Sequence, residues 1–156
     1  MPERWDQGRA EIDDLLARGE LESVAPDAAY ASQLIDQAEL HLSASRATAD
    51  MDPAGSFQLA YDAVRKSFAA VLLAQGLRAT SRGGHRALED AARAQLVPPF
   101  ESLIASYGWM RRLRNSTEYP APDRPHAMSG DVDRAHPVCV EAIAKARVLI
   151  QTMPTY

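Results

Sequence analysis

The sequence predicts an all-α protein, an antiparallel up-and-down bundle of about five helices. Apolar residues recur at helical spacing along most of the chain. Alanine is abundant and aromatic residues are few, a mixture that suits helix interiors because alanine loses no side-chain entropy there. No segment alternates polar and apolar residues for long enough to predict a strand, and the connections between the helical segments are short.

The N-terminal part predicts a short helix over residues 3–18. Trp5 begins its apolar stripe, and Gly19 offers a C-terminal stop. Because this helix is short, we interpret residues 1–25 as an N-terminal helical appendage and residues 26–156 as the bundle itself.

Apolar periodicity and end signals define the helices of the bundle. The segment with the strongest pattern begins at Asp52 and Pro53, an N-cap residue followed by a proline in the first helical position, and ends near Gly76. The basic segment 77–84 is expected to be a loop. The predicted bundle helices are residues 27–48, 53–76, 85–96, 99–118 and 131–153.

Prolines delimit the last two helices. Pro98 and Pro99 are expected to begin the helix over 99–118, and Pro120 to end it, because the residue before a proline is pushed out of the helical region. Ser129 and Asp131 are both candidate caps for the final helix. Pro137 must lie in the first turns of that helix or break it.

Composition narrows the function classes. The chain has 156 residues and a formal net charge of −4, which argues against a nucleic-acid coat protein but leaves room for a local basic site. Cys139 is the only cysteine, so an intrachain disulfide and a cysteine zinc site are excluded. No metal site or cofactor is predicted. The N-terminus lacks a signal-peptide pattern and no apolar run approaches a membrane span, so a cytoplasmic location is expected.

Three arginines, Arg111, Arg112 and Arg114, gather near the end of the helix over 99–118. A favourable interaction with the helix dipole accounts for the first two. Arg114 instead continues the apolar face of the helix, and an inward-facing arginine needs partners. Glu118, one turn further on, is the local partner. Two interpretations remain open at this point, a structural Arg114–Glu118 pair and a functional site.

A second basic segment precedes the helix over 85–96 and contains Arg82 and His85. A solvated loop is the ordinary interpretation. His85 nevertheless falls at a helix start, where free backbone amides favour either a cap or a bound anion.

Two segments resemble the HEPN domains, whose name stands for higher eukaryote and prokaryote nucleotide-binding. Residues 60–76 followed by 84–88 carry part of the likeness, and residues 114–119, Arg-Asn-Ser-Thr-Glu-Tyr, resemble the hallmark segment of the family. The resemblance covers residues 27–153, and small actinobacterial HEPN proteins are the most similar type. It implies a helical bundle that often dimerises, and in many members a ribonuclease that needs no metal.

The HEPN resemblance also implies site residues. Family ribonucleases use an arginine, often followed by asparagine, with a histidine five positions after the arginine. Arg114 and Asn115 match, but Tyr119 occupies the histidine position. Histidine exchanges a proton near neutral pH, whereas a tyrosine hydroxyl ordinarily keeps its proton. Arg114, Asn115 and Tyr119 are thus the candidate catalytic residues, and the candidate nucleotide- or RNA-binding residues are Arg111, Arg114, His85 and Arg82.

Three functions are consistent with these observations. The first is a HEPN-like RNA- or nucleotide-binding homodimer with a degenerate ribonuclease motif, in a toxin–antitoxin or phage-defence module whose antitoxin partner is a nucleotidyltransferase. The second is a helical protein-interaction module without chemistry. The third is an active, metal-independent endoribonuclease that uses the variant motif.

Overall fold

A computed structural model of the chain describes residues 5–156. Helices make up most of the fold, and one short two-stranded antiparallel sheet accompanies them, which confirms the predicted all-α bundle. In chain order the elements are α1 (Arg9–Ala17), β1 (Leu21–Ser23), α2 (Ala28–Thr48), α3 (Pro53–Gln75), β2 (Leu77–Ala79), α4 (Gly84–Leu96), α5 (Glu101–Glu118) and α6 (Ser129–Thr152).

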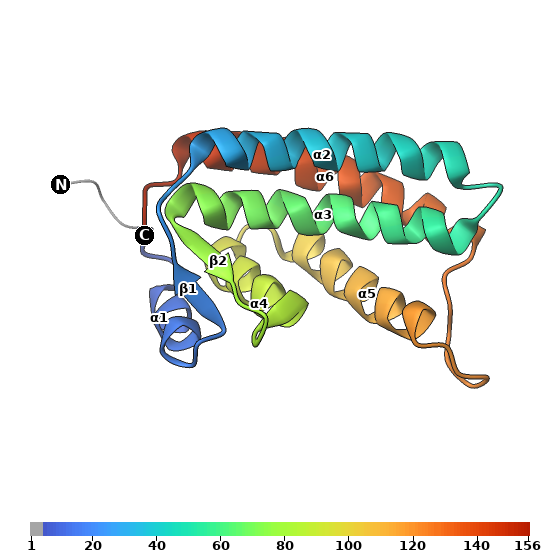
Figure 1. The fold of residues 1–156 in the computed structure, drawn as a ribbon, viewed down its shortest axis with the longest axis horizontal. Helices are drawn as coiled ribbons and strands as arrows, with labels where there is room; N and C mark the ends of the chain where they lie inside the picture. The colour runs from blue at the N-terminus through green and yellow to red at the C-terminus, as the bar shows by residue number, and fades with distance from the viewer. Residues whose placement is uncertain (1–4) are drawn as a thin grey trace.

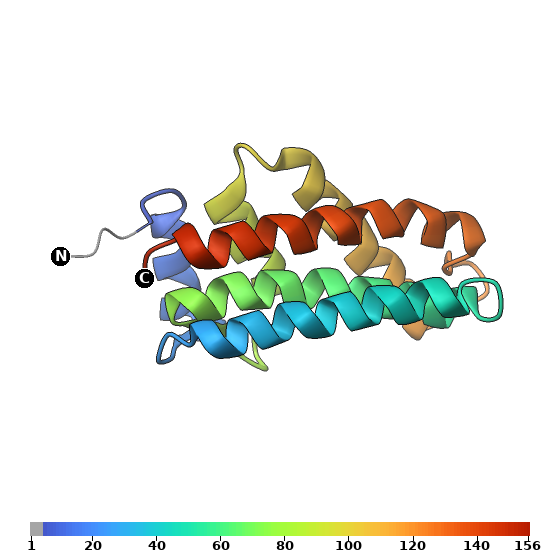
Figure 2. The same ribbon diagram turned by 90° about the horizontal axis from the view of Figure 1, so that it is seen from above.

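Three long helices, α2, α3 and α6, lie side by side and form the body of the bundle (Figures 1 and 2). The central helix α3 starts as its sequence predicts, because the side chain of Asp52 accepts a hydrogen bond from the Gly55 amide at 3.0 Å and Pro53 opens the first turn. It ends at Gly76, whose φ of 89° favours a residue without a side chain. Both predicted end signals of this helix are therefore confirmed.

The shorter helices α4 and α5 cover the remaining side of α3 (Figure 1). Leu103, Tyr107 and Met110 of α5 are each at most 2% exposed, and they face the common core. This inward seam confirms the predicted register of the helix. Since it fixes which face of α5 is buried, it also fixes the direction of every polar side chain near the end of α5.

A small sheet, which the sequence does not predict, replaces part of the expected loop at 77–84. Strand β2 pairs antiparallel with β1 in the register Leu21↔Ala79, Glu22↔Arg78 and Ser23↔Leu77. Each strand has only three residues, too few for an alternating pattern to show in the sequence. Leu21 and Leu77 are each 1% exposed, so burial of these side chains favours the pairing.

The N-terminal helix is shorter than expected, because it begins at Arg9 and not near residue 3. Residues 1–4 of that prediction lie outside the described part of the chain. Gly8 adopts a φ of 76°, which a right-handed helix cannot accommodate, and Trp5 instead donates its indole N–H to the Gln95 carbonyl at 3.0 Å. Helix α1 packs against α4 and buries Ile12 in the same core as the bundle.

Two further boundaries differ from the prediction. Helix α5 begins only at Glu101, so Pro98 and Pro99 precede the helix and do not open it. Helix α6 begins at Ser129, where the Asp131 carboxylate accepts the Met128 amide at 3.0 Å, and it continues through Pro137 without a break. Shifts of one or two residues at helix ends are ordinary.

Candidate functional site

The C-terminal end of α5 forms a shallow groove with the loop that follows it. We call it the arginine groove and define it by six lining residues. Arg114 continues the buried seam of α5, and its side chain is only 17% exposed. Asn115 is half-buried, whereas Tyr119 is 66% exposed at the helix end. The lining residues are Arg112, Arg114, Asn115, Ser116, Tyr119 and Arg124.

Arg114 has partners on two sides. Its Nη2 atom lies 2.5 Å from a carboxylate oxygen of Glu118, which confirms the structural pair that the spacing predicts. Its Nη1 donates to the Asn115 side-chain oxygen at 3.3 Å, and the guanidinium carbon lies 5.8 Å from the centre of the Tyr61 ring. These contacts hold the guanidinium at the inner edge of the groove, so the structural pair and a binding role are compatible.

A tyrosine–histidine pair lies behind Arg114, between α3 and the start of α4. The Tyr61 hydroxyl and His85 Nδ1 are 2.8 Å apart, and the two rings stack with centroids 5.6 Å apart. Tyr61 is fully buried, and burial raises its pKa to about 12. Burial also lowers the pKa of His85, and the charges of Arg65 and Arg114 lower it further. His85 is therefore neutral at pH 7, and it does not cap α4.

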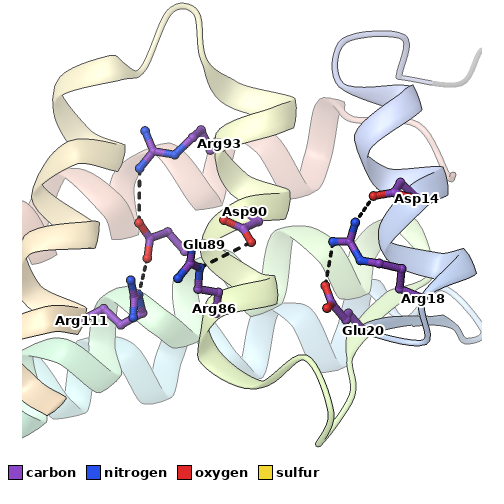
Figure 3. A network of polar contacts seen from close by, with 8 residues as sticks. All are labelled: Asp14, Arg18, Glu20, Arg86, Glu89, Asp90, Arg93 and Arg111. Atoms are coloured by element: carbon purple, nitrogen blue, oxygen red, sulfur yellow. Dashed lines mark hydrogen bonds and ion pairs between the residues drawn. The ribbon is translucent and has the colours of Figure 1, made fainter.

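Arg111, a candidate binding residue, points away from the groove toward α4. Figure 3 shows Glu89 between Arg111 and Arg93, and it bonds with both. The Glu89 side chain is 7% exposed and that of Arg111 is 15% exposed, so the pair is largely buried. Gly108 permits the close approach, because a Cβ at this position would lie 2.6 Å from Glu89 Oε1. The geometry of Arg111 is that of a packing residue.

The structure thus brings together some of the candidate residues and separates others. Arg114, Asn115 and Tyr119 line one groove at the end of α5. His85 reaches this group only through Tyr61, and Arg82 is exposed in the turn before α4, outside the groove.

Two groove residues, Arg112 and Arg124, are not predicted by the sequence as binding residues. The helix dipole accounts for Arg112 in the sequence, but in the structure Arg112 is exposed and borders the groove. Arg124 lies in the proline-rich loop between α5 and α6, and nothing in the local sequence shows that this loop folds back beside the helix end. Tyr61 lies within the expected helix over 53–76, and the fold alone shows its bond to His85.

Residues 5–156 contain no group of three His, Cys, Asp or Glu side chains placed to hold a metal ion. No helix in that part of the chain is both long and apolar enough to cross a membrane.

Comparison of the chain with protein-family models, with curated proteins and with solved structures gives no match. Function is therefore inferred from the geometry of the arginine groove and from the sequence resemblance described above.

Proposed function

We propose that the chain is a HEPN-like RNA-binding protein, and that the arginine groove holds the phosphates of single-stranded RNA. One observation carries the proposal: three arginines, Arg112, Arg114 and Arg124, converge from a helix and a loop on one groove whose six lining residues include no carboxylate. Arginine is suited to phosphate because its planar fork of donors matches two phosphate oxygens. A local basic site of this kind is compatible with a net charge of −4.

Tyr119 adds the second element of single-strand recognition. Tyr119 is 66% exposed and borders the groove, where an RNA base can stack on its ring. Such stacking is worth about 1–3 kcal/mol per base and tolerates any sequence. Glu118 lies outside the groove lining and offsets part of the charge of Arg114, so most of the phosphate attraction comes from Arg112 and Arg124.

The test is fluorescence anisotropy with a short labelled single-stranded RNA over a series of salt concentrations. Arg112→Ala and Arg124→Ala should each weaken binding. Each should also reduce the slope of log K against log salt by about 0.7 for every phosphate that the variant no longer neutralises. Tyr119→Ala should weaken binding with little change in that slope.

Arg86→Ala is the matched control, because the Arg86 side chain is 75% exposed and lies on α4 outside the groove. Equal weakening by Arg86→Ala would mean that any surface arginine suffices, which contradicts a defined groove. A protein that neither binds nor cuts RNA would instead favour the protein-interaction module.

The same proposal includes a homodimer, as the HEPN resemblance implies, and a nucleotidyltransferase-type antitoxin as a partner in a toxin–antitoxin or phage-defence module. Light scattering at tens of micromolar protein tests the dimer, and a monomeric mass would contradict it. A nucleotidyltransferase encoded next to this chain, co-purifying with it, would support the partner.

A further inference from the structure

A second pocket, separate from the arginine groove, is lined by His85. It lies between the first half of α2, the second half of α3 and the chain from β2 to the start of α4. Its volume is about 680 Å³, within the range of small-molecule sites. Nothing in the proposed RNA function uses this pocket. We call it the side pocket.

The side pocket is apolar along most of its length. Leu34 of α2, Ala69 and Leu72 of α3, and Leu88 of α4 line it from three helices. Pockets that bind small organic molecules share this character, an apolar wall with a small number of polar groups that orient the ligand.

Arg65 and His85 provide basic polar groups at one end of the pocket, whereas Arg78, which also lines the pocket, is paired with Glu22 across the sheet. Arg65 opens the stretch of α3 that lines it, and its Nε donates to Asp62 at 3.1 Å, which leaves the two terminal amino groups free of partners within residues 5–156. His85 also lines this part of the pocket. When the Tyr61 hydroxyl donates to Nδ1, the His85 proton lies on Nε2, where it is a further donor.

The acidic residue of the lining, Asp27, lies at the opposite end. Its backbone N–H donates to the Leu73 carbonyl at 3.3 Å, eight residues along α3 from Arg65. Eight residues of helix span about 12 Å, so Asp27 is remote from the Arg65 end. Its carboxylate accepts the Tyr30 amide at 2.8 Å and caps α2. The pocket is therefore elongated, with the unpaired amino groups of Arg65 at one end and an apolar channel between the two ends.

We propose that the side pocket binds a medium-chain monocarboxylic acid, with the carboxylate on Arg65 and His85 and the alkyl chain along Leu34, Ala69 and Leu72. A carboxylate accepts two parallel bonds from the amino groups of an arginine. The formal charges near this end, Arg65 with Asp62 and Arg114 with Glu118, cancel, so a monoanion fits better than a phosphate dianion. Binding of the acid is independent of the arginine groove.

Calorimetric titration with hexanoate, octanoate, decanoate and decanol tests the proposal. Affinity should rise with chain length, and decanoate should bind one to one and more tightly than decanol. Arg65→Gln should weaken decanoate binding by about tenfold, the effect of removing a charged hydrogen bond, while decanol binding is nearly unaffected. Lys66→Gln is the matched control, because Lys66 is adjacent on α3 but contacts Gln37 and His41 outside the pocket.

Ala69→Phe fills the apolar channel and should abolish decanoate binding. Should that variant not fold, methyl NMR of the unmodified protein locates the ligand, and decanoate should shift Leu34, Leu72 and Leu88. Shifts confined to Val140 and Val148, which are 47% and 59% exposed on α6, would overturn the proposal. It would also be overturned by decanol binding as tightly as decanoate, by equal effects of Arg65→Gln and Lys66→Gln, or by no saturable binding.

Discussion

Substitution of Arg111 separates packing from RNA binding most sharply. Arg111→Met keeps most of the side-chain volume but leaves the Glu89 carboxylate, 7% exposed, without its main partner. Breaking a buried pair on one side costs about 3–5 kcal/mol. Arg93 remains 3.2 Å from Glu89 and is half exposed, so we expect a loss of about 2–3 kcal/mol. For a protein of this size that lowers Tm by about 5–10 °C.

The assay combines thermal and urea unfolding with RNA anisotropy at 25 °C, where the variant is still folded. Arg111→Met should lower stability and leave RNA affinity unchanged, whereas Arg112→Ala should do the reverse, with a stability change of about 0.5 kcal/mol or less. The double variant Glu89→Met with Arg111→Met should recover stability, because both buried charges are removed together. If Arg111→Met instead lost RNA affinity at an unchanged Tm, the reasoning would be refuted, and Arg111 would be a binding residue.

Arg114, Tyr119 and His85 each provide a further test. Arg114→Ala should destabilise the protein by about 1.5–3 kcal/mol in urea unfolding, more than Arg112→Ala, and equal losses would contradict the partly buried placement. The protein should retain RNA without cutting it in metal-free buffer, and Tyr119→His should create or raise cleavage on a gel; no gain would mean that the remaining geometry does not support catalysis. Burial, then Arg65 and Arg114, lower the pKa of His85 below its usual 6.5, so the unfolded chain binds its proton first as pH falls. The urea midpoint of the protein should therefore fall as the pH is lowered from about 7.5 to about 5.5, and the midpoint of His85→Gln should fall by less. A midpoint that rises on acidification would contradict this.

The helices could be predicted from the sequence because their signals are local. Asp52, Pro53 and Gly76 mark the ends of α3 within the segment itself, and the structure confirms all three. The sheet could not be predicted, since Leu21 pairs with Ala79 and Ser23 with Leu77 across more than fifty residues, and each strand is too short for a pattern.

Like the fold, the candidate site could be predicted only where its residues lie close together in the sequence. Arg114, Asn115 and Tyr119 lie within one and a half turns of the end of α5, so their nearness follows from the sequence, although Arg114 and Tyr119 lie on different sides of the helix. Arg124 joins them only because the loop after α5 folds back, and His85 approaches Arg114 only through Tyr61 on a third element. Such contacts depend on tertiary packing between distant segments, and no fixed spacing in the sequence reveals them.

The three neighbouring arginines of α5 show why charge alone is a poor guide to function. Each residue turns the helix by about 100°, so Arg111 and Arg114 lie about 60° apart, with Arg112 on another face. Arg111 pairs with Glu89 of α4, Arg114 lies over the Tyr61 ring of α3, and Arg112 remains exposed beside the groove. A ligand phosphate competes with a buried carboxylate at Arg111, whereas Arg112 makes no ion pair within residues 5–156. Arg112, which contributes least to the packing of the fold, is therefore the arginine whose charge is most available to a phosphate ligand such as the proposed RNA.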